Sequence, residues 1–226
     1  MKNLVVLTGA GISVESGLKT FRDSDGLWMG YNVYEVATPE GYKKNPKLVL
    51  DFYNMRRREV TKALPNSAHK GIADLQQHFN VTVITQNIDD LHERAGSKNV
   101  LHLHGEIFKM RGERDINTLY EIKGDINLGD IAPDKTQFRP HVVWFNEQVP
   151  MIEQASIIMS EADIFVLAGT SLQVYPAAGL IDYLRDNVPK YIIDTNPPYI
   201  PPHHNFHIIK KSATEGIGEL VKNFDL

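Results

Sequence analysis

The start of the chain decides the fold, where residues 4–17 read LVVLTGAGISVESG. The run Leu4–Thr8 is apolar without alternation, which is typical of a strand buried on both faces of a parallel sheet. Two closely spaced glycines follow, and glycine lets a backbone turn tightly and approach a phosphate. The third glycine is Gly17, later than in the common Gly-x-Gly-x-x-Gly fingerprint, and no Gly-Lys-Ser/Thr follows as in a P-loop. A phosphate-binding loop therefore competes with a tight strand-to-helix turn that binds nothing.

Short apolar runs alternate with amphipathic stretches along the rest of the chain. The expected strands are Leu4–Thr8, Val81–Thr85, Ile164–Ala168 and Tyr191–Asp194, with an edge strand near Phe206–Lys210. The expected helices, with apolar residues at helical spacing, are Ser67–His78, Met151–Ser160, Ala177–Asp186 and Ala213–Phe224. This alternation predicts an α/β fold with a Rossmann-like, doubly wound parallel sheet. Ligands in such folds bind at the carboxyl ends of the strands.

Two segments interrupt this rhythm. Lys19–Leu64 is largely helical in pattern but too long for a simple crossover, and Ile107–Arg139 is polar and rich in turn residues. We expect both to be insertions that together build a smaller module, so that residues 1–226 form one domain with two parts. The large part would comprise about 1–18, 65–106 and 140–226, and the small module about 19–64 and 107–139. A ligand would bind in the cleft between them.

Composition excludes several classes of site. The chain has no cysteine, which excludes disulfides, thiolate zinc sites, iron–sulfur clusters and cysteine nucleophiles. The formal net charge is -4 at pH 7, which gives no footprint for nucleic acid or an anionic membrane. The apolar run Leu4–Leu7 is too short for a signal peptide or a membrane span. We therefore expect a cytoplasmic protein with no nucleic-acid partner and no membrane partner.

Polar residues follow the expected strands at the places where a ligand would bind. Gln86, Asn87 and Asp89 follow the second strand, and their side chains can hydrogen-bond ribose hydroxyls and a carboxamide. An Asn or Asp at this place could also cap a helix. The third strand runs into Gly169–Ser171 and the fourth is followed by Asn196, which are further places for phosphate or ribose contacts.

An aromatic ring and a cation follow the glycine-rich turn, at Phe21 and Arg22. Beside a phosphate loop they could cover a ring and bind a phosphate. The alternative is a packed phenylalanine and a surface arginine.

Two histidines lie close together, where residues 101–105 read LHLHG. Alternation places His102 and His104 on one face if this segment is a strand. They could bind a metal together with His92, or His104 could act as a general base beside a ribose. Each could also be a structural histidine, which is how we interpret His102.

Taken together, these motifs resemble those of the sirtuins, a family of NAD-dependent protein lysine deacylases. The matching segments occur in order over nearly the whole chain: Gly9–Ser13, Gly17–Arg22, Gln86–Asp89, His104–Gly105, Arg139–Pro140, Gly169–Ser171 and Asn196. One of these motifs alone is a weak indication, but the ordered set is highly specific. The resemblance implies a Rossmann-type NAD-binding domain with a small domain made from two insertions. It also implies NAD as a consumed co-substrate and acyl-lysine proteins or peptides as partners.

The resemblance further implies a role for each candidate residue. The NAD loop would include Gly9, Ala10, Gly11, Ser13, Gly17, Thr20, Phe21, Arg22 and Trp28, with Phe21 shielding the nicotinamide side and Arg22 near the phosphates. Gln86 and His104 would contact the nicotinamide ribose, and Asn87, Ile88 and Asp89 would line the nicotinamide pocket. The adenosine half would be held by Gly169, Thr170, Ser171, Asn196 and Ala213. The substrate peptide would be clamped as a strand by Val143 and the backbone around Leu172–Tyr175.

The implied reaction moves the acyl group from lysine to the ribose of NAD. The acyl oxygen of the modified lysine attacks the ribose carbon as nicotinamide leaves, with His104 as the base on the ribose hydroxyls and Asn87 as the second catalytic residue. The products are free lysine, nicotinamide and O-acyl-ADP-ribose. A neutral imidazole suits this task near pH 7, and a bound ribose would be held in attack geometry.

A helical motif concerns the identity of the acyl group. Residues 51–58 read DFYNMRRR, so Tyr53 and Arg56 are three positions apart and share a helix face. In one branch of the sirtuins, a Tyr-x-x-Arg at this place binds the acyl carboxylate of succinyl-, malonyl- or glutaryl-lysine, and such a pair can bind a carboxylate by charge-assisted bonds. We therefore predict removal of acetyl and of succinyl or malonyl groups. The alternative is an exposed basic helix face, which suits Arg57 and Arg58.

The chain departs from the family pattern at two places. Most sirtuins hold a structural zinc ion on four cysteines, and here the first pair is replaced near Gly112 and Asp115 and the second near Ile131–Asp134. We therefore expect no zinc and no other metal site, and a module held by packing or by polar contacts of Arg111, Glu113, Arg114 and Asp115. Asn146 stands beside the peptide cleft where a glycine is usual.

Three other functions stay open. An NAD-dependent dehydrogenase would carry the Gly-x-Gly-x-x-Gly fingerprint, which this chain lacks. A protein ADP-ribosyltransferase or an NAD hydrolase could use the same scaffold, although Tyr53 and Arg56 favour an acyl-lysine ligand. A module that binds NAD or ADP-ribose without catalysis would not need Asn87 and His104.

Overall fold

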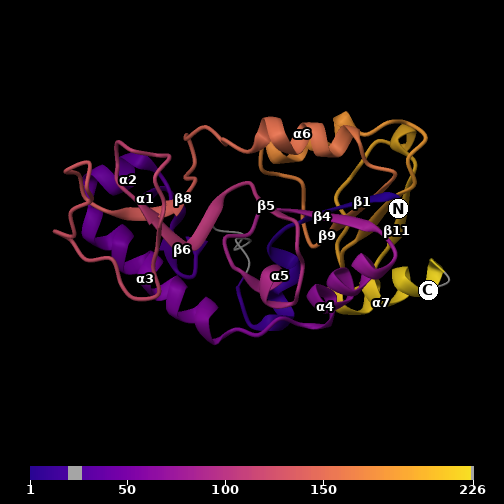
Figure 1. The fold of residues 1–226 in the computed structure, drawn as a ribbon, viewed down its shortest axis with the longest axis horizontal. Helices are drawn as coiled ribbons and strands as arrows, with labels where there is room; N and C mark the ends of the chain where they lie inside the picture. The colour runs from indigo at the N-terminus through magenta and orange to yellow at the C-terminus, as the bar shows by residue number, and fades with distance from the viewer. Residues whose placement is uncertain (20–26, 225–226) are drawn as a thin grey trace.

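A parallel sheet forms the centre of the protein in a computed structural model, which describes residues 1–19 and 27–224 (Figure 1). Its strands are β1 (Asn3–Thr8), β4 (Asn80–Thr85), β5 (Val100–His102), β9 (Ile164–Ala168), β10 (Lys190–Ile193) and β11 (Phe206–Ile209). They lie in the order β11-β10-β9-β1-β4-β5, and every neighbouring pair is parallel. The chain order reverses between β1 and β9, which is the arrangement of a doubly wound α/β fold.

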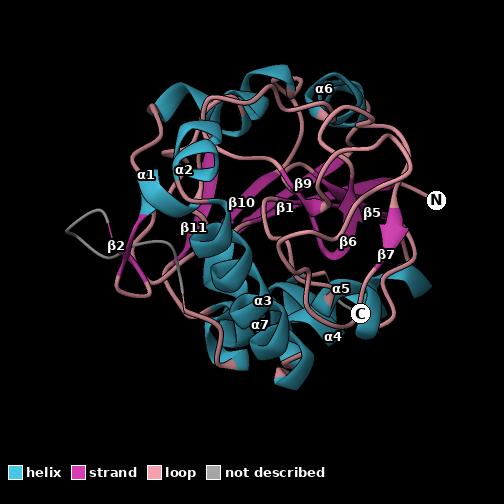
Figure 2. Cartoon of the chain, turned by 90° about the vertical axis from the view of Figure 1, so that its left-hand side faces the viewer, coloured by secondary structure: helices cyan, strands magenta, loops and turns pink. Residues whose placement is uncertain are grey.

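Helices cover both faces of this sheet, and β1 contributes to both interfaces. The covering elements are α4 (Ser67–Asp74), α6 (Ile152–Ser160), α7 (Ala213–Asn223) and the 3-10 helix η3 (Ala177–Tyr183). Leu4 and Val6 pack in the cluster with α4 and α7, whereas Val5 and Leu7 pack in the cluster with α6 and η3 (Figure 2). All four side chains are at most 2% exposed, which explains why this strand is apolar without alternation.

Most expected elements are confirmed, and one has a different helix type. All five expected strands are present, and β5 joins them at the edge of the sheet. The helix expected over Ala177–Asp186 is present as the shorter 3-10 helix η3, and Leu184 is already extended. Gly179 in its centre disfavours an α-helix. Across residues 1–19 and 27–224, no helix is both long and apolar enough to cross a bilayer, while the cellular location stays a prediction.

A second hydrophobic core lies beside the sheet, at the left of Figure 1, and combines segments from both expected insertions. The first insertion supplies β2 (Leu27–Trp28), β3 (Tyr31–Asn32), α1 (Val33–Val36), α2 (Pro39–Lys44) and α3 (Pro46–Lys62). The second supplies a small antiparallel sheet of β6 (Gly105–Arg111), β7 (Tyr120–Glu121) and β8 (Arg139–Val142). Phe52 and Tyr53 of α3 pack with Ile107 and Trp144 in this core. The residue boundaries of the two parts stay a prediction.

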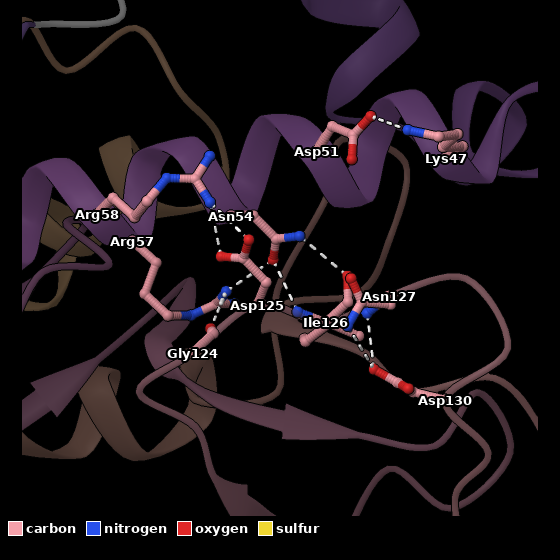
Figure 3. Close-up of polar contacts among 10 residues, drawn as sticks. All are labelled: Lys47, Asp51, Asn54, Arg57, Arg58, Gly124, Asp125, Ile126, Asn127 and Asp130. Carbon is pink, nitrogen blue, oxygen red and sulfur yellow. Dashed lines mark hydrogen bonds and ion pairs between the residues drawn. The ribbon is translucent and has the colours of Figure 1, made fainter.

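Side chains of the helix α3 form hydrogen bonds with the backbone of the second insertion. Asn45 accepts a hydrogen bond from the amide of Leu48 and so caps the start of the helix. Asn54 pairs with both backbone groups of Ile126 at 2.9 Å, and Arg57 donates to the carbonyl of Gly124 at 3.1 Å (Figure 3). Arg57 also donates to the carbonyl of Ile107 at 2.8 Å.

This corrects the interpretation of Arg57 and Arg58 as an exposed basic face. Arg57 is only 1% exposed and binds backbone carbonyls inside the module. Arg58 does lie at the surface, where it pairs with Asp125 at 2.6 Å (Figure 3). The exposed-face interpretation therefore fits Arg58 alone.

A carboxylate joins the two loops in which most sirtuins carry zinc ligands. Asp134 accepts hydrogen bonds from the backbone amides of Arg114 at 3.1 Å and Asp115 at 2.9 Å, and from the Thr136 hydroxyl at 2.6 Å. The bonds from Thr136 and Asp115 hold the pKa of Asp134 well below its usual range. The chain has no cysteine, so no four-cysteine zinc ribbon can form, and within the described residues no group of three His, Asp or Glu could hold a metal.

The polar contacts expected for this module occur, with Asp134 as their centre. Glu113 accepts from the hydroxyl of Tyr42 at 3.1 Å, and Arg111 donates to the carbonyl of Gly112 at 3.1 Å. Arg114 and Asp115 donate through their backbone amides, and the Asp115 carboxylate also accepts from the amides of Asn117 at 3.0 Å and Thr118 at 3.1 Å.

Candidate active site

A cavity of about 930 Å³ opens where the carboxyl ends of β1, β4 and β9 face the small module. This volume lies near the upper end of the range for ligand-binding pockets. The cavity is lined by most of the residues expected at the site: Gly9, Ala10, Gly11, Ser13, Trp28, Tyr53, Arg56, Gln86, Asn87, Ile88, Asp89, His104, Val143, Gly169, Thr170, Ser171, Tyr175 and Ala213. Segments from all parts of the sequence therefore meet in one place.

The first wall is formed by the loop after β1, which becomes the 3-10 helix η1 (Ala10–Ser16), and by the loop after β9. The amide of Gly11 donates to the carbonyl of Gly169 at 2.8 Å. A Cβ atom at Gly11 would lie 2.7 Å from the Cα atom of Gly169, closer than real Cβ atoms approach a backbone. The glycine at position 11 is therefore required for the contact between the two loops, in addition to any approach to a phosphate.

The loop after β4 holds its polar side chains by hydrogen bonds to η1. The side-chain amide of Asn87 donates to the Ser13 hydroxyl at 3.2 Å, and this hydroxyl donates to the carboxylate of Asp89 at 3.1 Å. The other carboxylate oxygen of Asp89 accepts from the amide of Leu91 at 3.2 Å. Burial raises the pKa of Asp89, and the bonds from Leu91 and Ser13 oppose that shift. The side chain of Asn87 is thus fixed at the cavity wall before any ligand binds.

His104 is held in the neutral form with one defined tautomer. Its Nδ1 lies 3.0 Å from the carbonyl of Gln86, and a carbonyl only accepts, so Nδ1 carries the proton. The lone pair is then on Nε2. Burial lowers the pKa of His104, and the bond to Gln86 only partly opposes this shift. The side chain of Gln86 is fixed in turn, because it donates to the Thr170 hydroxyl at 3.0 Å. A neutral imidazole at a cavity wall can accept a proton from a ligand hydroxyl.

His102 is in the opposite protonation state, although it lies only two residues away. Its Nδ1 is 3.0 Å from the carbonyl of Asn87, and its Nε2 is 2.8 Å from a carboxylate oxygen of Glu93. Both partners only accept, so both ring nitrogens carry protons and the ring is cationic. Burial alone would lower the pKa of His102, but the bond and the charge of Glu93 outweigh it and raise the pKa.

The metal interpretation of these histidines has no support in the described part of the chain. His102 is engaged by Asn87 and Glu93, and His92 is buried with Nε2 at 3.1 Å from the Thr8 hydroxyl. Among residues 1–19 and 27–224, no cluster of three His, Asp or Glu suits a metal ion. His102 instead fixes the backbone of Asn87.

The opposite wall of the cavity belongs to α3 and contains buried donors. Tyr53 is 1% exposed, and its hydroxyl makes no hydrogen bond with the described residues. Burial raises the pKa of Tyr53, so the hydroxyl keeps its proton. Arg56 lies one turn further along, with its side chain 6% exposed and its guanidinium 5.3 Å from the ring centre of Trp28. Its Nε also lacks a partner in the described part of the chain. This wall suits a ligand that brings an acceptor.

The segment after β8, residues 143–147, borders the cavity on the side expected for a peptide. The amide of Val143 donates to the carbonyl of His104 at 2.9 Å, and the amide of Phe145 donates to the carbonyl of Ala37 at 2.9 Å. Asn146 has a φ of 69°, a left-handed conformation that asparagine adopts more readily than most residues. The asparagine can therefore hold this left-handed position in the turn. Tyr175, which also lines the cavity, is 78% exposed.

Some expected residues lie elsewhere. Three described residues that were expected at the site do not line the cavity: Gly17, Leu172 and Asn196. Gly17 ends η1 in the left-handed conformation, Leu172 packs on the sheet, and Asn196 is exposed with its amide bound to Asp194 at 2.8 Å. Thr20, Phe21 and Arg22 lie outside the described residues.

Several contacts at the site carry no signal in the sequence, because their partners are far apart along the chain. Glu15 accepts from the Thr214 hydroxyl at 2.7 Å and so ties η1 to the start of α7. Glu147 forms two bonds to Arg139, at 2.7 and 3.0 Å, and accepts from the amide of Trp144 at 2.8 Å. The Arg139–Glu147 ion pair therefore holds residues 143–147, which border the peptide side of the cavity, against β8.

Comparison with known proteins identifies related sequences over almost the whole chain. Residues 9–176 match the Sir2 family. An NAD-dependent protein deacylase of Helicobacter pylori (strain ATCC 700392 / 26695) is 51% identical over 221 residues, which cover 98% of this chain and 96% of that protein. A protein of the same description from Bacteroides thetaiotaomicron is 51% identical over 226 residues, with 97% of each chain covered.

Solved structures share the fold as well as the sequence. A mutant of a Sir2 homologue in complex with ADP-ribose superposes with a TM-score of 0.89 at 36% identity, covering 99% of this chain and 92% of that chain. A complex of a Sir2 homologue with NAD superposes with a TM-score of 0.86 at 37% identity, covering 99% of this chain and 90% of that chain.

Proposed function

Because the chain belongs to the Sir2 family and is an NAD-dependent protein deacylase, we propose that it removes succinyl or malonyl groups as well as acetyl groups from lysine side chains of proteins. The observation that carries this proposal is the pair of buried donors on α3, the hydroxyl of Tyr53 and the guanidinium of Arg56, which face the same cavity as His104. The products are free lysine, nicotinamide and O-acyl-ADP-ribose.

The residues at the strand ends fit NAD. Glycines of both loops line the cavity with Ser13, Gln86, Asn87 and Thr170, whose side chains are hydrogen-bond donors and acceptors suited to ribose, phosphate and carboxamide groups. We assign the phosphates and the adenosine half to Gly9–Ser13, Gly169–Ser171 and Ala213, together with Asn196 by family resemblance. The same resemblance assigns Gly17, Thr20, Arg22 and Trp28 to the NAD loop and gives Phe21 the role of shielding the nicotinamide side. Bound NAD supplies a ribose carbon that becomes electrophilic as nicotinamide leaves.

His104 is the base in this proposal. Its Nε2 accepts a proton from a ribose hydroxyl, while the Nδ1 bond to Gln86 keeps the ring in one orientation and one tautomer. The carbonyl that holds the ring can also stabilise the imidazolium that forms, because it accepts from Nδ1 in both protonation states. Asn87, fixed by Ser13, and the neighbouring Ile88 and Asp89 orient the carboxamide end of the pocket.

The acyl group would lie against α3. A dicarboxylic acyl group ends in a carboxylate, which can accept from the Tyr53 hydroxyl and from the Arg56 guanidinium. An acetyl group ends in a methyl and would leave the Tyr53 hydroxyl and the Nε of Arg56 without a partner. Buried donors without partners cost free energy, so the wall favours the longer, charged acyl group. Val143 and Tyr175, which line the cavity, would border the peptide backbone of the substrate, and Leu172 would do so by family resemblance.

Mass spectrometry of the products tests this function. The protein is mixed with NAD and with matched acetyl-lysine and succinyl-lysine peptides, and His104→Ala serves as the control. We expect deacylated peptide together with O-acyl-ADP-ribose, at a higher rate for the succinyl peptide. Consumption of NAD without deacylated peptide would instead assign ADP-ribosyl transfer or NAD hydrolysis to this cavity.

A further inference from the structure

Arg56 already has a carboxylate partner inside the protein. Its Nη1 donates to a carboxylate oxygen of Glu59 at 2.9 Å, one turn further along α3. Residues three apart on a helix share a face, so Glu59 approaches the same guanidinium that faces the cavity. The side chain of Glu59 is 38% exposed and that of Arg56 is 6% exposed. The pair therefore consists of a fixed cation and an anion that can move into solvent.

We propose that Glu59 sets the selectivity among acyl groups, by competing with the acyl carboxylate of the substrate for Arg56. This inference rests on the acyl role proposed above for Tyr53 and Arg56. A succinyl or malonyl carboxylate must either displace Glu59 from Nη1 or share the guanidinium with it. In both cases a like charge stands close to the acyl carboxylate, which weakens its binding. An acetyl group has no charge and does not meet this penalty.

The alternative role for Glu59 is to hold Arg56 in position, and the surroundings of Arg56 argue against it. The guanidinium lies over the Trp28 ring at 5.3 Å, and Nη1 also contacts the sulfur of Met29 at 3.1 Å. The side chain is buried along its length. These contacts fix Arg56 without Glu59, so the loss of Glu59 removes a competitor and leaves the arginine in place.

The free donors of Arg56 support competition over simple exclusion of the substrate. Glu59 uses only Nη1, while Nε is buried and without a partner among the described residues. A guanidinium carries five donors, so one carboxylate does not saturate it. Desuccinylation should therefore occur in the wild-type protein and increase when Glu59 loses its charge.

The readout is the ratio of kcat/KM for a succinyl-lysine peptide to kcat/KM for the matched acetyl-lysine peptide. Glu59→Gln should raise this ratio roughly 10-fold, the order expected when one like charge is removed a few ångströms away at a partly exposed site. Glu59→Ala should raise it as well, which assigns the effect to charge and not to the new amide. The gain should lie mainly in KM, because the competition is for binding.

A matched control removes the same charge elsewhere on the helix. Asp51 pairs with Lys47 on the solvent face of α3 at 2.7 Å (Figure 3), so Asp51→Asn should leave the ratio within about 2-fold of wild type, as for exposed pairs in general. An unchanged or lowered ratio in both Glu59 variants would overturn the inference.

Arg56→Met separates the two ways in which the experiment can fail. If Arg56→Met collapses the ratio while both Glu59 variants leave it unchanged, the acyl role of Arg56 holds and only the competition is wrong. If Arg56→Met leaves the ratio unchanged, the proposed acyl role is wrong and the inference on Glu59 falls with it.

Discussion

The two neighbouring histidines predict a bell-shaped dependence of activity on pH. His104 must be neutral to act as a base, and burial lowers its pKa, so activity should rise with pH only in the acidic range below the ordinary histidine value. His102 must be cationic to hold both Asn87 and Glu93, and its pKa is raised. A raised pKa means that the contribution of His102 is complete at low pH and is lost as pH rises through the folded-state pKa. The descending limb of the pH profile should therefore lie above the ordinary pKa of histidine.

The structure also gives the size of the effect at His102. Loss of one proton turns either the bond to Asn87 at 3.0 Å or the bond to Glu93 at 2.8 Å into a contact between two acceptors. A charge-assisted hydrogen bond contributes about 1.5–3 kcal/mol and a neutral one about 0.5–1.5 kcal/mol. The hydrogen bond from His102 then stabilises the backbone position of Asn87 by about 1–2 kcal/mol less. If catalysis requires this position of Asn87, the rate should fall roughly 5- to 30-fold.

The assay is kcat/KM for one peptide from acidic to alkaline pH, in wild type and in His102→Gln. Glutamine does not titrate, so the variant should be slower at neutral pH and should lack the descending limb. Glu93→Gln removes the charge that raises the pKa of His102 and should move the limb to lower pH.

Other titratable groups near His102 are Glu106 on β6, and Asp89 and His92 in the loop and helix after β4. An unchanged descending limb in His102→Gln would assign the limb to another group and refute the reasoning. Thermal melting at each pH shows whether a loss of activity reflects unfolding.

Three further predictions concern the base, the small module and the metal. His104→Ala should abolish deacylation but keep NAD binding, measured by calorimetry, because the ring acts on a proton and the loop contacts of Gly11 and Ser13 remain. Arg57→Met should lower the free energy of unfolding in urea by about 3–5 kcal/mol, because it leaves buried carbonyls without donors, whereas Arg58→Met should cost about 1 kcal/mol or less. Chelators should leave activity unchanged and metal analysis should find less than one zinc per chain, since no cysteine is present; one bound zinc per chain would contradict this.

The sheet was predictable because its signals are local. The strand β1 is apolar from Leu4 to Leu7 since both faces are covered, and this property is visible in four consecutive residues. The position of the site was predictable for the same reason, because parallel strands end at one edge and the polar residues after them must lie near one another. Gln86, Asn87 and Thr170 meet at the cavity in this way.

The partners of individual side chains were not predictable from the sequence. The proton on His102 depends on Glu93 and on a carbonyl of Asn87, and neither contact follows from spacing along the chain. The type of η3 also depends on its surroundings, since apolar spacing alone does not distinguish a 3-10 helix from an α-helix. The hydrogen-bond partners of a side chain, and therefore its protonation state, can be assigned only in the folded chain.

The three consecutive arginines of α3 show why composition alone could not assign their roles. Successive residues on an α-helix point about 100° apart, so Arg56, Arg57 and Arg58 must face three different directions. Arg56 faces the cavity and is balanced by Glu59, and Arg58 faces solvent and is balanced by Asp125. Arg57 faces the interior, where its hydrogen bonds go to neutral groups and burial lowers its pKa to about 10. The partner of each arginine thus separates their roles: in the proposed function, an exposed carboxylate would allow exchange with a substrate at Arg56, while backbone carbonyls make Arg57 a fixed link between the two insertions.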